Sequence, residues 1–378
     1  MKKVPVHTVF EYFGCMPDPR IDRTKDHKLL DIIVIAICAV ICGADGWVGV
    51  EEFGKSKLDW FKQFLDLPNG IPSHDTFGRV FSRLDREKFA ECFANWIAAV
   101  ASLTAGEVVA IDGKTLRRSF DTASSKGAIH MVSAWACENG LVLGQVKTDE
   151  KSNEITAIPK LLDVLDISGC IVTIDAMGCQ KKIAEKIIDE EGDYIFGLKG
   201  NQGTLNDDVR NFFQYAEGEK FKDIPHDYAE TVDGDHGRIE TRRVWCTSDT
   251  DWFQEKDLWK GLASFGMVES ERIVGDKTSI ERRYFISSLA GDDAEQFGKA
   301  VRQHWQIENT LHWTLDLSFR EDDSRIRSGS AAENMAVLRH IALNLLKKER
   351  SVKLGVKNKR LKAGWDDDYR LKVLFGHS

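Results

Sequence analysis

A run of apolar segments between residues 107 and 201 constrains the fold of this chain more than any other feature. EVVAIDGKTL, AIHMVSAWAC and LVLGQVKT have the composition of β-strands, and Asn139-Gly140 between the last two is typical of a hairpin turn. GCIVTIDAM and DYIFGLKGN are two further apolar strands, and a helical pattern precedes each of them. We therefore expect an antiparallel meander of three strands, followed by two helix–strand units.

The order strand, strand, strand, helix, strand, helix, strand is not that of a Rossmann unit. It is the order of a ribonuclease-H-like fold, so we predict an α/β chain with a core of that kind over residues 105–200. Residues 1–104 are predicted to form an all-helical N-terminal domain that binds DNA, and 201–297 a mainly β insertion. Helical periodicity returns in 298–348, which would complete the core, and the polar residues 349–378 would form a basic tail.

Two aspartates occupy equivalent places in this pattern. Asp112 ends the strand VVAID, and Asp175 ends the strand IVTID. Apolar strands of α/β sheets often deliver site residues at their carboxyl ends. Aspartate also ends strands as an ordinary turn former, so either residue alone could be structural. Because the first and fourth strands of a ribonuclease-H-like core are neighbours, we expect the two carboxylates to converge.

A third carboxylate, Glu308, lies in the helical segment VRQHWQIENTLHWTLDLSF. His304 and His312 are four residues away on either side and share its helix face. A carboxylate on an apolar helix face is costly to bury unless it is paired or bound to a metal. Pairing with a flanking histidine is one alternative. A His-Glu-His zinc site is a weaker one, because the HExxH spacing is absent.

The three carboxylates predict a site for hard divalent cations. Oxygen ligands without thiolates suit Mg²⁺ or Mn²⁺. Such ions commonly act in pairs about 3.5–4 Å apart in the cleavage of phosphodiesters. We therefore expect two ions of Mg²⁺ or Mn²⁺ as cofactors.

Five segments, in order, resemble bacterial insertion-sequence DDE transposases of the H-repeat-associated branch. These segments are VVAIDGKTLRRS, TIDAMGCQ, YIFGLKGNQ, DHGRIETR and HWQIENTLHWTLDLSFREDDSRIR, and the resemblance covers nearly the whole chain. It implies that Asp112, Asp175 and Glu308 are the catalytic, metal-binding triad. It also implies cleavage of double-stranded DNA at element ends, attack of the freed 3′-OH on target DNA, and a homodimer on DNA.

Basic and polar residues near these motifs are candidates for contacts with DNA phosphates. The candidates are Lys114, Arg117, Arg118, Lys199, Asn201, Gln202, Arg238, Arg242, His304 and Asn309. His304 stands where many relatives have an arginine. Arg79 and Arg83 lie on a predicted helix capped by Ser73, which could read a DNA groove or be an ordinary amphipathic helix.

The charge distribution restricts where DNA could bind. The chain carries 52 basic and 60 acidic residues, a net charge of −8, which argues against a general basic coat. Residues 201–297 hold 21 acidic and 12 basic residues, whereas 298–378 hold 10 acidic and 16 basic. We therefore expect DNA along the triad face and the basic C-terminal end, with the residues from 347 onward as a phosphate-binding arm.

The sequence predicts a cytoplasmic protein. Its eight cysteines form no CxxC pair, and the apolar run from Ile32 to Ala44 is shorter than the ~20 residues of a membrane span. Two alternatives to an active transposase remain. One is a transposase-derived DNA-binding protein without turnover, and the other is a plain ribonuclease-H-like nuclease.

Overall fold

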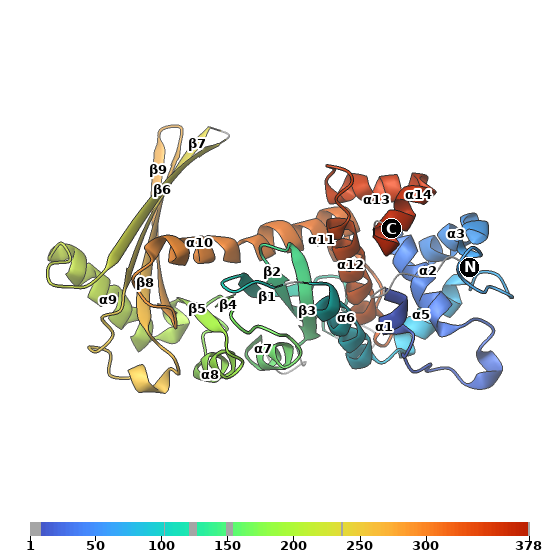
Figure 1. The fold of residues 1–378 in the computed structure, drawn as a ribbon, viewed down its shortest axis with the longest axis horizontal. Helices are drawn as coiled ribbons and strands as arrows, with labels where there is room; N and C mark the ends of the chain where they lie inside the picture. Colours follow the sequence, from blue (N-terminus) through green and yellow to red (C-terminus); the bar gives the residue numbers. More distant parts are fainter. Residues whose placement is uncertain (1–8, 102, 121–126, 149–153, 236, 377–378) are drawn as a thin grey trace.

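A single nine-stranded sheet forms the centre of the computed structural model, which describes residues 9–101, 103–120, 127–148, 154–235 and 237–376 (Figure 1). Its strand order is β3-β2-β1-β4-β5-β9-β8-β7-β6. The first five strands are β1 (Val108–Leu116), β2 (Ile129–Ala136), β3 (Leu141–Lys147), β4 (Ile171–Ile174) and β5 (Asp193–Leu198). β1, β2 and β3 are antiparallel, whereas β4 and β5 run parallel to β1. The ribonuclease-H-like core is confirmed.

The helices between these strands cover one face of the core. α7 (Glu154–Leu162) packs on β2 and β3, and α8 (Lys181–Asp189) packs on β5. Both helices are amphipathic, and their apolar side chains, such as Ile158 and Ile183, are buried. Figure 1 shows them on the side of the sheet opposite α10. Residues 149–153, where the sequence pattern begins the first of these helices, lie outside the described residues.

The inserted segment continues the core sheet. Its strands are β6 (Asp227–Asp235), β7 (Arg238–Thr247), β8 (Ser264–Val274) and β9 (Lys277–Ser287), here called the blade. β9 pairs antiparallel with β5 from Ile195↔Ser287 to Leu198↔Tyr284. The halves of the strands next to the core are buried beside α9 (Thr204–Gly218) and α10, while their outer halves are exposed and project from the molecule (Figure 1).

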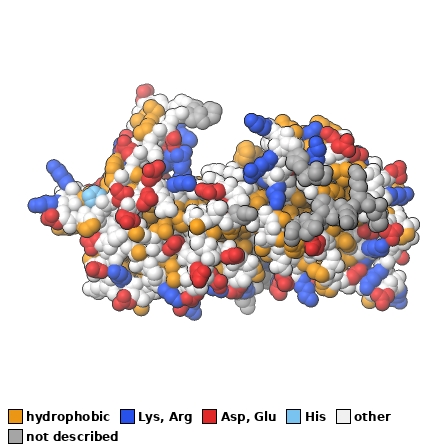
Figure 2. All heavy atoms as spheres, viewed as in Figure 1, with side chains coloured by type: hydrophobic (Ala, Val, Ile, Leu, Met, Phe, Trp, Pro, Cys, Tyr) orange, Lys and Arg blue, Asp and Glu red, His pale blue; other side chains and the backbone are white. Residues whose placement is uncertain are grey.

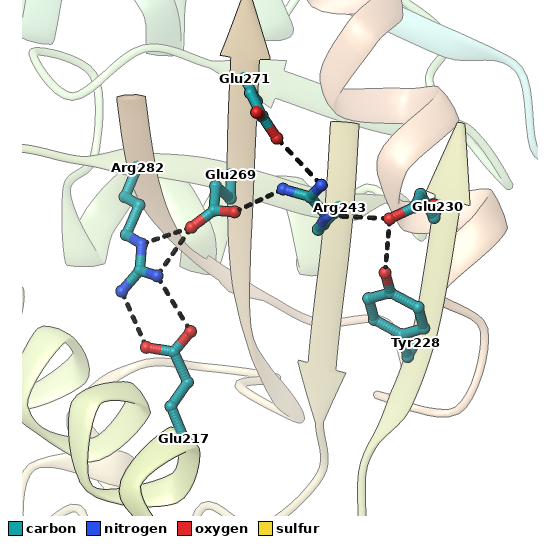
Figure 3. A network of polar contacts seen from close by, with 7 residues as sticks. All are labelled: Glu217, Tyr228, Glu230, Arg243, Glu269, Glu271 and Arg282. Carbon is teal, nitrogen blue, oxygen red and sulfur yellow. Dashed lines mark hydrogen bonds and ion pairs between the residues drawn. The ribbon is translucent and has the colours of Figure 1, made fainter. Parts of the chain in front are cut away.

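Arginines on the blade are paired with carboxylates of the same segment (Figure 3). Arg243 contacts Glu230 at 2.8 Å, and Glu269 and Glu271 each at 2.9 Å. Arg282 contacts the same Glu269 and also Glu217 of α9, both at 2.7 Å. Part of the acidic charge of residues 201–297 is therefore neutralised within the blade.

A long, interrupted helix crosses the other face of the sheet. It comprises α10 (Ala294–His304), a π-helical turn (Ile307–His312) and α11 (Trp313–Phe319), and we call it the Glu308 helix. Two glycines let it lie close to the blade. A Cβ at Gly266 would stand 2.3 Å from Phe297, and a Cβ at Gly298 would stand 2.7 Å from Val244. No side chain other than hydrogen fits either place.

The remaining helices form a bundle around α12 at one end of the molecule (Figure 1). They are α1 (Val9–Phe13), α2 (Leu29–Ile41), α3 (Trp47–Ser56), α4 (Leu58–Phe61), α5 (His74–Arg83), α6 (Arg86–Val100), α12 (Ala331–Lys348), α13 (Val356–Trp365) and α14 (Asp367–Phe375). α12 contacts α2, α5, α6 and β3, so it joins the N-terminal helices to the core. The apolar segment predicted as a buried helix is α2, and almost all of it is buried. Within the described ranges, no helix is both long and apolar enough to span a membrane.

The C-terminal residues fold differently from the predicted basic arm. α13 and α14 pack back onto the bundle, and three of their cations are buried. Arg360 donates a 2.8 Å hydrogen bond to the Val40 carbonyl, Lys359 donates one of 2.9 Å to the Leu346 carbonyl, and Arg370 stacks over Trp60. Because these side chains satisfy helix ends and aromatic faces, they are not available to a phosphate backbone.

Replacing Asn344 with alanine should destabilise the protein by about 2–4 kcal/mol, because two buried backbone groups would lose their partners. The Asn344 side chain accepts from the Val142 N–H at 2.9 Å and donates to the Val142 carbonyl at 2.8 Å. Urea unfolding measures the loss. The exposed Asn358→Ala is the control, with an expected change below about 0.5 kcal/mol. Equal losses in the two variants would contradict this role.

Candidate active site

The two aspartates lie level with each other on neighbouring strands. Asp175 follows the end of β4, as predicted, but β1 does not end at Asp112, because the next four residues continue to pair with β2 as far as Leu116. β1 and β4 are parallel, and Ile111 is the register partner of Ile174. Asp112 and Asp175 are the next residue on each strand, so the pairing itself brings them side by side. The Asp175 carboxylate accepts a 2.9 Å hydrogen bond from the Met177 N–H, which fixes it in the turn after β4.

The Glu308 helix passes over this part of the sheet, and two of its histidines lie against the strands that carry the aspartates. His304 Nδ1 lies 3.1 Å from the Thr173 hydroxyl on β4, two residues before Asp175. His312 Nδ1 lies 3.6 Å from the Asp112 carboxylate. Burial lowers the pKa of each histidine to about 4, so both rings are neutral at pH 7. Glu308 lies between them in the π-helical turn, and its side chain is exposed.

The electrostatics at Asp112 reflect its burial and the carboxylates around it. Burial, and after it the negative charges of Glu154, Glu308 and Asp175, raise the pKa of Asp112 to about 7, against the lowering effect of a hydrogen bond from the Gly113 N–H. Both causes disfavour the charged form of this carboxyl.

Hard divalent cations fit this donor set. Every donor is a carboxylate oxygen, and the negative charge around Asp112 is what a bound cation would offset. Within the described ranges, no three His, Cys, Asp or Glu side chains are grouped closely enough to hold one metal ion. Holding a cation would therefore require the carboxylates to move closer together.

The three basic residues that follow Asp112 are paired with acidic residues in α11 or just beyond it. Lys114 contacts both Asp316 and Glu321, and its side chain is only 12% exposed. Arg117 lies 3.2 Å from Asp322, and Arg118 lies 3.4 Å from Asp323. These ion pairs clamp the end of the Glu308 helix to β1. Lys114, predicted to hold a phosphate, could do so only by giving up Asp316, which is partly exposed, and the buried Glu321.

The polar residues after β5 hold the loop that carries Asp175. Asn201 and Gln202 donate hydrogen bonds of 2.8 and 3.1 Å to the Ala176 carbonyl, and Gln202 also donates to the Cys179 carbonyl at 2.8 Å. Their amide groups were predicted to contact DNA, but they are engaged within the protein. Lys199, beside them, is exposed.

The other predicted DNA-binding residues lie at the surface. Arg238 and Arg242 are on β7, an even number of residues from Val244, so the three side chains lie on the same face of the strand. Val244 contacts α10 at Gly298, so this is the face of the blade that packs against α10. Arg242 is paired with Asp233 at 2.8 Å and with Glu240 at 2.7 Å, whereas Arg238 is 46% exposed. Asn309 is exposed beside Glu308.

Arg79 and Arg83 are exposed on α5, far along the chain from the site. The Ser73 hydroxyl caps this helix by accepting from the Thr76 N–H, as predicted. The apolar face of α5, which includes Phe77, is buried in the bundle.

Sequence reasoning missed a fourth carboxylate, Glu154. It begins α7, is buried, and makes the largest like-charge contribution to the raised pKa of Asp112. The sequence signal was faint, because a glutamate in the first turn of a helix is ordinary.

The Asp112→Asn variant should be more stable than the wild type at pH 8 in metal-free buffer. The pKa of Asp112 is about 7 in the folded protein, which is higher than in the unfolded chain. Its ionisation therefore destabilises the fold, and the stability of the wild type falls as the pH rises from about 4 to 7. At 1.36 kcal/mol per pKa unit, we expect a gain of about 2–4 kcal/mol at pH 8 and almost none at pH 4. Denaturant unfolding with EDTA measures it, with the exposed Asp257→Asn as control. A gain independent of pH would refute the prediction.

Lys114→Met should cost about 3–5 kcal/mol, because it removes the closer of the two cations that balance the buried Glu321 and leaves Asp316 without its cation. Burial would raise the pKa of Glu321, but the charges of Lys114 and Arg339 hold it below its ordinary value. Arg117→Met is a matched control, because its side chain is 79% exposed and its pair should contribute less than about 1 kcal/mol. If both variants unfolded at the same urea concentration, the proposed stabilising role of Lys114 would be wrong.

Comparisons with known proteins identify the family to which this chain belongs. Residues 104–345 match the family model described as "Transposase DDE domain", and residues 10–97 match the model "DDE_Tnp_1-associated". The "H repeat-associated putative transposase YhhI" of Escherichia coli (strain K12) is 46% identical over 97% of this chain and 98% of its own length. The "Putative transposase YncI" of Escherichia coli O157:H7 is 45% identical over 98% and 95%.

Two further matches are more distant or more partial. The "Inactive transposase YbfQ" of Escherichia coli (strain K12) is 48% identical over 20% of this chain and 89% of its own length. A piggyBac transposase synaptic complex solved with hairpin DNA has a TM-score of 0.43 and 11% identity, over 97% of this chain and 77% of that chain. The family matches span most of the residues described above, and this chain belongs to the transposase DDE domain family.

Proposed function

We propose that this protein is an active DDE transposase, which cleaves DNA at the ends of an insertion-sequence-like element and joins the freed 3′ ends to target DNA. The observation that carries the proposal is the β1–β4 register, which sets Asp112 and Asp175 level beneath the helix that bears Glu308. Carboxylates that hold cations act as ligands rather than as nucleophiles, so water or a DNA 3′-OH would be the nucleophile in this mechanism.

In this mechanism, Asp112, Asp175 and Glu308 would hold two Mg²⁺ or Mn²⁺ ions. Such cations, when bound, activate the attacking oxygen and stabilise the leaving oxygen of the phosphodiester. The chain itself supplies the positioning. Asn201 and Gln202 hold the loop of Asp175, and the Lys114 clamp fixes the Glu308 helix against β1.

The surface suggests a path for double-stranded DNA. Figure 2 shows a hollow above the Glu308 helix, between the blade and the C-terminal helices, with Lys and Arg side chains on both walls. Arg238 and Arg242 lie on the face of the blade that packs against α10. On the Glu308 helix, Asn309 is exposed and Trp313 is 61% exposed. Phosphate contacts from the walls would orient the duplex over Glu308. Lys199, Arg117 and Arg118 are additional candidates, and Arg79 and Arg83 would require a second contact at the bundle.

Asp175→Ala and Glu308→Gln should abolish cleavage and strand transfer while leaving DNA affinity largely unchanged, because neither carboxylate attracts a phosphate. The assay uses labelled DNA carrying the terminal inverted repeats that flank the gene, with Mg²⁺, and measures binding by mobility shift. Glu190→Gln, at an exposed helix end, is the control and should behave as the wild type. If the two site variants lost DNA binding as fully as cleavage, the assignment of the triad would be refuted.

A transposase-derived DNA-binding protein without turnover is the second candidate function, favoured by the carboxylates not being grouped closely enough for a metal ion. Identical behaviour of the wild type and Asp112→Asn in the strand-transfer assay would establish it. Hydrolysis without joined products would instead indicate a plain nuclease. For the active enzyme we expect a homodimer on DNA, because two element ends must be held together, and action in the cytoplasm.

A further inference from the structure

Glu154 is buried next to the proposed triad and is held by a chain of two polar side chains. Its Oε1 lies 2.8 Å from His130 Nε2, and His130 Nδ1 lies 2.9 Å from the Thr115 hydroxyl. Thr115 and His130 are register partners on β1 and β2, so the sheet itself fixes the ring. The orientation of the Glu154 carboxylate is therefore set by the core rather than by solvent.

The residue after Asp112 makes room for this carboxylate. A Cβ at Gly113 would stand 2.1 Å from Glu154 Oε1 and 2.4 Å from His130 Nε2. Only glycine allows the pair to rest against the strand at this position. The Glu154 carboxylate thus lies over the residue adjacent to Asp112, at the point where β4 has ended and no longer covers β1.

The negative charge of Glu154 acts on Asp112 more strongly than that of any other carboxylate around it. The contact with His130 gives Glu154 a partner but does not offset the repulsion between the two carboxylates, which a cation near both would offset. A neutral amide at position 154 could keep the hydrogen bond to His130 without this repulsion.

We propose that Glu154 is a fourth carboxylate of the Asp112 centre, oriented by His130 and Thr115, and that it strengthens divalent-cation binding there. The inference rests on the proposed function, because it concerns the same cation site. Glu154 and Asp112 would flank one cation position, and His130 acts as a positioning residue through Glu154.

The test is the affinity of the purified full chain for Mn²⁺, measured by titration calorimetry without DNA. We expect Glu154→Gln and His130→Ala each to weaken binding about 10–100-fold, as losses around metal sites do. Glu190→Gln is the matched control, with unchanged affinity. In the Glu154→Gln background, His130→Ala should have little further effect, because the histidine acts only through the carboxylate.

Gly113→Ala provides a second test that alters no charge. The added methyl displaces the Glu154 carboxylate, so Mn²⁺ binding should weaken to a similar degree, and should not weaken further when Glu154→Gln is also present. Thermal melts in EDTA confirm that each variant is folded. Should Glu154→Gln not fold, Gly113→Ala and His130→Ala decide the question in the same titration.

The inference would be overturned if Glu154→Gln bound Mn²⁺ with an affinity within twofold of the wild type. The same result in both Gly113→Ala and His130→Ala would also overturn it. Asp112→Asn separates this failure from failure of the proposed function. If Asp112→Asn loses Mn²⁺ binding while Glu154→Gln keeps it, only the role of Glu154 is wrong. If the wild type itself does not bind Mn²⁺, the cation site and the inference fail together.

Discussion

The parallel register of β1 with β4 is the constraint on which the candidate site depends. Both strands are apolar and buried up to Ile111 and Ile174, and those residues are partners in the pairing. A slip of one residue would turn the side chains of one strand to the opposite face of the sheet. The core therefore resists such a slip, and the same burial that stabilises the strands keeps Asp112 and Asp175 level.

The candidate site differs from two other parts of the molecule in how its charges are balanced. In the blade, Arg243 and Arg282 are paired with carboxylates, and Lys114 is paired with carboxylates at the end of the Glu308 helix (Figure 3). At Asp112, by contrast, the charges that act on the carboxyl are those of other carboxylates, and the two histidines of the Glu308 helix are held neutral by burial. This local excess of negative charge is the property that attracts a divalent cation.

Strong apolar periodicity explains which elements were predictable. The five core strands, the buried α2 and the Ser73-capped α5 follow from local patterns, and all are present. The strand β6 was not predicted, because DYAETVDGD is polar and exposed along most of its length. The residues from 349 onward were predicted as a basic tail because they are polar and basic, and cations such as Arg360 and Arg370 usually lie at the surface. They are buried against a helix end and an aromatic ring supplied by other parts of the chain.

The sequence by itself determined the order of the core elements and the placement of Asp175 at the end of its strand, because strand patterning and turn chemistry are local. It did not show that β1 continues past Asp112 to Leu116, because that extension depends on pairing with β2. Only the tertiary structure decided that β9 joins β5, so that the insertion extends the core sheet, and that Lys114 is paired within the protein. It alone also placed Glu154 over Gly113, beside Asp112. Each of these depends on contacts between residues distant in sequence, whose partners are selected by shape and charge once the sheet has formed.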